Sequence, residues 1–127
     1  MIKKLAPVLV VDRIEPLLAL WEALGFRRTT EVPSGDVLGF VILERDGIEV
    51  MYQTRDSVRA DEPHVLEGAP PLGAAALFIE VDDLEAMARA LPAGTAVINA
   101  RRQTFYGSTE TIFRDGAGNV ITLAQMG

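Results

Sequence analysis

Short apolar runs alternate with segments of helical periodicity along the chain. Residues 5–11 form a nearly all-apolar run rich in valine, which is typical of a strand covered on both faces. The next segment, 12–26, carries apolar residues at helical spacing and predicts a helix with Asp12 as its N-cap and Gly25 as its end. β-branched and aromatic residues then predict three further strands, at 26–32, 37–44 and 48–54.

The second half of the chain repeats this order. An apolar run, an Asp82/Asp83 cap, a helix that stops at Pro92 and three more strand patterns follow one another between residues 74 and 127. The phrase "VDRIE" at 11–15 aligns with "VDDLE" at 81–85, and "RDG" occurs at both 45–47 and 114–116. A single offset of about 70 residues indicates one duplication rather than a repeat array.

The duplication predicts an α+β fold of two tandem βαβββ modules. The first module is expected at 1–54 and the second at 74–127, and both belong to one structural domain. Residues 55–73 are rich in charge, glycine and proline, and they predict a linker loop over the surface. Such a long connection is expected only at a boundary or in a functional lid.

Composition narrows the class of partner. The 127 residues include no cysteine, which excludes disulfides and thiolate metal sites and suits a cytoplasmic protein. The net charge of -6 disfavours nucleic acid and mildly favours cationic small molecules. No apolar run is long enough to span a membrane. The start, "MIKKLAPVLVV", has the charge and apolar order of a signal peptide, but Asp12 and Arg13 interrupt it.

The sequence resembles the vicinal oxygen chelate superfamily, which includes glyoxalase I, extradiol dioxygenases and the metal-free bleomycin-resistance proteins. The resemblance covers essentially the whole chain. It rests on the paired modules and on three phrases: "VLVVDRIEPLLALWEALGF", "FIEVDDLEAMARAL" and "FYGSTETIFRDGAGNVITLAQ". It implies that each module forms a cupped sheet, that two modules, from one chain or from two subunits, enclose a cleft, and that the protein is a homodimer.

The resemblance also implies where a metal would bind. Enzymes of the family hold a divalent metal with His or Gln on the first strand and Glu on the last strand of each module. Alignment of the two halves places these positions at Ala6, Met51, Ala76 and Thr122, and none of these residues is a ligand for such a metal. We therefore predict no cofactor, and a divalent metal only if an atypical ligand set exists.

Eight residues are candidates for the cleft. Glu49 and Glu80 share the strand parity of the metal positions, although a solvated glutamate at a strand end is the common alternative. Phe78 and Met51 are expected as apolar liners. Phe105 and Tyr106, beside Gly107, can form a wall over a planar ligand. The alternative is an ordinary turn with one buried ring. The full candidate set is Met51, Glu49, Phe78, Glu80, Phe105, Tyr106, Glu110 and Thr122.

Other conspicuous residues have simpler interpretations. Trp21 follows the helical stripe and is expected in the core. His64, the single histidine, is expected to be solvated in the linker. The arginine pairs at 27–28 and 101–102 are interpreted as charges that protect exposed strands from aggregation, with contacts to anions as the alternative.

Three functions compete. The favoured one is a metal-independent small-molecule-binding protein that sequesters a cationic or aromatic, antibiotic-like ligand. The rival is a glyoxalase-type lyase or isomerase, or a dioxygenase, whose atypical metal site would use Glu49, Glu80 or Glu110. The third is an accessory module whose cleft is vestigial and whose partner is another protein.

Overall fold

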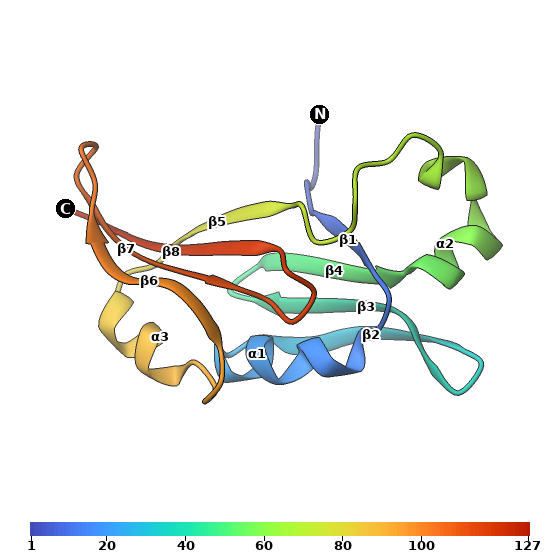
Figure 1. Ribbon diagram of the computed structural model, residues 1–127, viewed down its shortest axis with the longest axis horizontal. Coiled ribbons are helices and arrows are strands. Elements are labelled where there is room, and N and C mark those ends of the chain that lie inside the picture. The colour runs from blue at the N-terminus through green and yellow to red at the C-terminus, as the bar shows by residue number, and fades with distance from the viewer. The chain divides into compact units, whose positions relative to one another are not determined.

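The computed structural model describes all of residues 1–127 and divides the chain into two compact units. Unit 1 spans Met1–Leu72 and unit 2 spans Gly73–Gly127. The order β-α-β-β-β can be followed once in each unit along the colour gradient of Figure 1. Each unit contains one four-stranded mixed sheet, so the predicted α+β fold with two repeated modules is confirmed.

Unit 1 contains four strands and four helical segments. Its sheet has the order β1-β4-β3-β2, with β1 parallel to β4 and the other pairs antiparallel. The connection after β4, predicted as a loop, contains two helical segments. The elements are β1 (Val8–Val11), η1 (Glu15–Leu17), α1 (Leu18–Ala23), β2 (Arg27–Ser34), β3 (Val37–Arg45), β4 (Ile48–Thr54), α2 (Arg55–Asp61) and η2 (Pro63–Leu66).

The core of unit 1 lies between α1 and one face of the sheet. Trp21 is fully buried, as predicted, and its indole nitrogen donates a 2.9 Å hydrogen bond to the Tyr52 hydroxyl. Phe26 packs edge-on against Trp21 with ring centroids 4.9 Å apart. Alternate strand residues complete this face, because successive side chains of a strand point to opposite sides. They are Leu9, Val11, Val41, Leu43 and Val50.

Two local predictions in unit 1 were wrong. Asp12 does not cap the first helical segment, which begins at Glu15 without a side-chain cap. The Asp12 carboxylate lies 3.3 Å from the Arg55 guanidinium instead. The segment after β4 forms α2 because the Thr54 hydroxyl accepts a hydrogen bond from the backbone N–H of Ser57, which is an N-cap.

Unit 2 repeats the topology with the sheet order β5-β8-β7-β6. Asp83 caps α3 as predicted, since its carboxylate accepts a 3.1 Å hydrogen bond from the backbone N–H of Ala86. Phe113, Ile121 and Leu123 form the buried face under this helix. The elements are β5 (Ala76–Glu80), α3 (Leu84–Ala90), β6 (Ala96–Gln103), β7 (Ser108–Arg114) and β8 (Val120–Met126). No helix of either unit has the length and apolar composition needed to cross a membrane.

Candidate functional site

Six of the eight candidate residues lie on the far face of a sheet, which we define as the face turned away from α1 in unit 1 and from α3 in unit 2; Phe105 and Tyr106 lie in the turn between β6 and β7. In unit 1 the strand pairing places Val8, Met51 and Ile42 side by side on this face. The next row contains Val10, Gln53 and Phe40. Met51 is half-buried there. Apart from Gln53, the side chains of these two rows are apolar, so most of the far face of unit 1 is hydrocarbon.

A charged row closes one end of this apolar surface. Glu49 and Glu44 are cross-strand partners, which would repel each other if they were alone. Each has a cation of its own: Lys4 lies 2.8 Å from Glu49, and Arg27 lies 3.3 Å from Glu44. The backbone N–H of Gly47, followed by Arg27, lowers the pKa of Glu44. Glu49 is therefore held by Lys4 at the border of the far face.

In unit 2 the far face carries an exposed aromatic ring and a carboxylate. Phe78 pairs with Thr122 across β5 and β8, and Ile112 is the next neighbour of Thr122. Phe78 is 56% exposed. Glu80 follows on the same face, about 6.6 Å along the strand at roughly 3.3 Å per residue. Glu80 is exposed and forms no ion pair.

A buried carboxylate organises the other half of this face. Glu110 is 0% exposed and accepts hydrogen bonds from three side chains. The Arg102 guanidinium donates two of them, at 2.8 and 3.0 Å, and the Ser108 hydroxyl donates another at 2.9 Å. The Tyr106 hydroxyl also donates to Glu110. Glu110 thus joins the two strands β6 and β7 to the hairpin between them.

These contacts keep Glu110 charged. Burial raises the pKa of the Glu110 carboxyl, but its three hydrogen-bond donors and the charge of Arg102 outweigh burial, and they hold the pKa below its ordinary value. The carboxylate is therefore ionised at neutral pH and fully occupied by internal partners. Such a group is a poor general base, because a base needs a free lone pair within reach of its substrate.

The hairpin after β6 presents two aromatic rings. Tyr106 is anchored by Glu110, and its side chain is 44% exposed. Phe105 packs edge-on against Tyr106 with centroids 5.1 Å apart, and it is 100% exposed. The sequence allowed either a turn with one buried ring or an aromatic wall over a ligand. The Phe105 ring is not buried, and both rings are exposed as a wall would require.

The far faces do not fit the metal that the family resemblance implies. Met51 has Val8 and Ile42 beside it, and Thr122 has Phe78 and Ile112, so the neighbours in the first strands are two residues beyond the predicted Ala6 and Ala76. A thioether, a hydroxyl and hydrocarbon do not supply the imidazole and carboxylate ligands that such metals prefer. No three His, Asp or Glu side chains come together elsewhere, and His64 lies exposed beside Glu62.

Comparison with known proteins agrees with this architecture. The family model described as Glyoxalase/Bleomycin resistance protein/Dioxygenase superfamily matches residues 4–123. The chain belongs to this superfamily. No curated protein matches the sequence.

Solved structures share the fold at low sequence identity. TioX from Micromonospora sp. ML1 is 18% identical and superposes with a TM-score of 0.77 over 97% of this chain and 98% of TioX. A glyoxalase/bleomycin resistance protein/dioxygenase family enzyme from Burkholderia phytofirmans PsJN is 17% identical, with a TM-score of 0.74 over 95% of this chain and 96% of that one. A protein from the mobile metagenome of V. Pseudocholerae is 24% identical, with a TM-score of 0.71 over 100% and 97% of the two chains. At these identities the likeness shows the fold alone.

Sequence reasoning missed the role of Arg102. We interpreted it as one of two exposed charges on an edge strand, but it donates two hydrogen bonds to one carboxylate oxygen of Glu110, its cross-strand partner. An arginine and a glutamate at facing positions of a hairpin were the available signal. That signal was hidden because register shifts interrupt the pairing between Val97 and Arg102.

Proposed function

We propose that this superfamily member binds a small organic ligand without a metal and sequesters it. The observation that carries the proposal is the far face of unit 2, where Phe78 and the unpaired carboxylate of Glu80 stand side by side in place of a metal-binding set. An aromatic ring stacks on planar ligands, and a carboxylate attracts a positive charge. The ligand class is therefore a cationic aromatic compound, such as an antibiotic of the bleomycin type.

The net charge and the neighbours of Phe78 in unit 2 support the same class. A net charge of -6 favours cations over anions around the protein. Apolar side chains flank the ring within unit 2 as well, since Ile112 is the neighbour of Thr122, which pairs with Phe78. We further propose that the protein is cytoplasmic and acts as a homodimer.

Calorimetric titration with metal-free bleomycin and with proflavine, a planar cation, tests the proposal. We expect binding in the presence of EDTA. Phe78→Ala and Glu80→Gln should each weaken it about five- to tenfold, which is the size of one stacking or charge contact. Asp36→Asn, which removes an exposed carboxylate from the β2–β3 turn, is the matched control and should bind as the wild type does.

Three outcomes would contradict the proposal. Failure of both compounds to bind at any accessible concentration would remove the antibiotic-like ligand class. Binding that is unchanged in Phe78→Ala and Glu80→Gln would move the site away from the far face of unit 2. Activity that depends on a stoichiometric metal would favour the alternative, a glyoxalase-type lyase or a dioxygenase.

A further inference from the structure

A polar cavity of about 440 Å³ lies on the α3 side of the unit 2 sheet. Thr109 and Gln125 line it, and they are cross-strand partners that alternate with Glu110 and Ala124 along β7 and β8. Because successive strand residues point to opposite faces, this cavity opens on the other side of the sheet from Glu80 and Phe78. It is a different site from the one proposed above.

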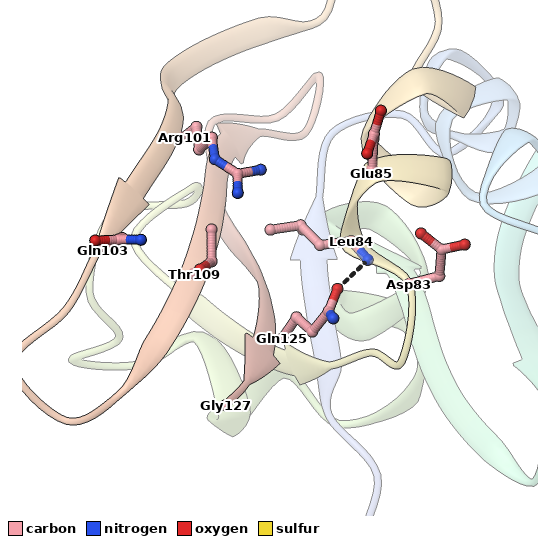
Figure 2. Close-up of a pocket in the computed structure, with 8 residues that line it drawn as sticks. All are labelled: Asp83, Leu84, Glu85, Arg101, Gln103, Thr109, Gln125 and Gly127. Carbon is pink, nitrogen blue, oxygen red and sulfur yellow. Dashed lines mark hydrogen bonds between the residues drawn. The ribbon is translucent and has the colours of Figure 1, made fainter.

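The cavity exists because the residues on this face of the sheet change from apolar to polar beyond the N-terminal end of α3. Under the helix, Phe113 and Ile121 form a buried apolar pair. The next pair, Thr111 with Leu123, is also buried. The pair after it is Thr109 with Gln125, and both residues are polar. Leu84, the first residue of α3, extends toward the strands and closes the apolar core there (Figure 2). The polar row is left beside open space that a ligand can fill.

The cavity carries both signs of charge. Figure 2 shows Arg101 reaching from β6 toward α3, and this guanidinium forms no ion pair. Glu85 lies on the helix side, and so does Asp83, whose carboxylate caps α3 and points away from Arg101 in Figure 2. Glu85 has only a long contact of 3.4 Å with the exposed Arg89, which is worth little in water. Arg101 and Glu85 thus offer one cation and one anion to the same small space without pairing with each other.

Backbone groups at this end of α3 are already engaged. The N–H of Leu84 donates a 2.8 Å hydrogen bond to the Gln125 side-chain oxygen, and the N–H of Ala86 donates to Asp83. Side chains are therefore left to recognise a ligand. Gln125 has its amide nitrogen free to donate, and Gln103 and Thr109 add an amide and a hydroxyl.

We infer that this cavity binds a small zwitterion, such as a free α-amino acid. Its carboxylate would pair with the fork of Arg101, and its ammonium group with Glu85. A simple anion would meet the Glu85 carboxylate, and a simple cation would meet Arg101, so a ligand with both charges fits the cavity better than either. No aromatic ring lines the cavity, which disfavours the planar ligands proposed for the far face.

Titration of ¹⁵N-labelled protein with L-glutamine, followed by NMR, tests the inference. We expect shifts of the amide signals of Leu84, Glu85, Gln103 and Gln125. Acetate and methylammonium, which carry one charge each, should bind at least about tenfold more weakly, because each loses one ion pair and keeps one repulsion. No shifts at any accessible concentration, or equal binding of either half-ligand, would overturn the inference.

Charge-specific variants locate the site. Arg101→Gln should abolish binding of L-glutamine. The double variant Asp83→Asn, Glu85→Gln keeps an oxygen for the N-cap but removes both charges, so it should bind acetate better and L-glutamine worse. Arg27→Gln, in unit 1, is the control and should bind L-glutamine normally, as should Phe78→Ala. Binding that survives Arg101→Gln would contradict the inference and leave the far-face proposal untouched.

Discussion

Unit 1 buries six side chains from the segment through η1 and α1, whereas unit 2 buries a single one, Leu84, from α3. The six are Ile14, Leu17, Leu18, Leu20, Trp21 and Leu24. Unit 2 instead buries polar side chains that bond to one another, and Glu110, Asp115 and Asn119 are the clearest of these. The same topology is thus stabilised mainly by helix–sheet packing in unit 1. In unit 2, hydrogen-bonded polar groups contribute a larger share.

The two "RDG" turns show the same divergence. In unit 1, Asp46 and Gly47 both have positive φ, at 53° and 79°, which gives a tight two-residue hairpin. In unit 2 the turn is longer: Asp115 accepts hydrogen bonds from the backbone N–H groups of Ala117 and Asn119. The Asn119 side-chain oxygen also accepts from the N–H of Ala75, before β5. Identical letters therefore form different turns, because the residues after the glycine differ.

Replacing Trp21 should have the largest effect on stability. Trp21→Ala removes a fully buried ring and the hydrogen bond to Tyr52, so the free energy of unfolding should fall by about 3–5 kcal/mol. Leu84→Ala in unit 2 should cost less, about 2–3 kcal/mol. Urea unfolding followed by circular dichroism measures both. Equal losses of unfolding free energy in the two variants would show that the two cores contribute equally to stability. That result would contradict the difference between the units.

Replacing Glu110 tests the polar half of the comparison. Glu110→Gln keeps the shape but loses the charged contact with Arg102, and it should lower the free energy of unfolding by about 1–3 kcal/mol. Proton NMR should also show a more mobile Tyr106 ring. Glu31→Gln, at an exposed carboxylate of unit 1, is the control and should change stability by less than about 0.5 kcal/mol. A neutral Glu110→Gln would mean that the buried network is not stabilising.

Glycines of the two units should differ in their tolerance of alanine. Gly73 and Gly35 both have positive φ, so alanine is strained at each, by about 1 kcal/mol. At Gly73 the added carbon would also lie 2.3 Å from the backbone oxygen of Ala117, whereas at Gly35 nothing lies within 4 Å. Gly73→Ala should therefore cost about 1–2 kcal/mol more in thermal or urea unfolding. Equal costs would show that the Asp115–Asn119 turn can move.

Acid should reveal the smallest effect. The folded pKa of Glu110 is lowered, so its stabilising contribution is complete above the ordinary glutamate pKa of about 4.3 and is lost as pH falls through the lowered value. Glu110→Gln should therefore lose less stability than the wild type between neutral and acid pH. Glu15 should keep some acid sensitivity in both proteins, because the N–H of Leu38 lowers its pKa. Urea unfolding at a series of pH values measures this, and identical pH profiles would contradict the charged state of Glu110.

Much of the fold could be predicted from the sequence because periodicity and turn residues are local signals. The strands after "RDG", the Asp83 cap and the buried Trp21 all depend on neighbours in the chain. The helix α2 could not be separated from a loop, since its glycine- and proline-rich surroundings outweighed the Thr54 cap. Asp12 failed as a cap because Pro16 starts the helical segment later.

The candidate site was less predictable because it depends on strand register. Parity alone placed Phe78 and Glu80 on one face, and the structure agrees. The contact of Arg102 with Glu110 and the cavity beside Arg101 depend on which residues face each other across irregular strands, and a sequence does not state this pairing. The hydrogen bond from Tyr106 to Glu110 likewise depends on how the hairpin folds back.

Elemental analysis of protein purified without a histidine tag tests the central claim most directly. The far faces offer hydrocarbon, Met51 and Thr122 where the family resemblance implies His or Gln together with Glu. The measurement should be made before and after dialysis against EDTA, alongside the proflavine titration. We predict far less than one Fe, Mn, Ni or Zn per chain and ligand binding that EDTA does not change. One tightly held metal per chain, with binding lost on its removal, would contradict the account.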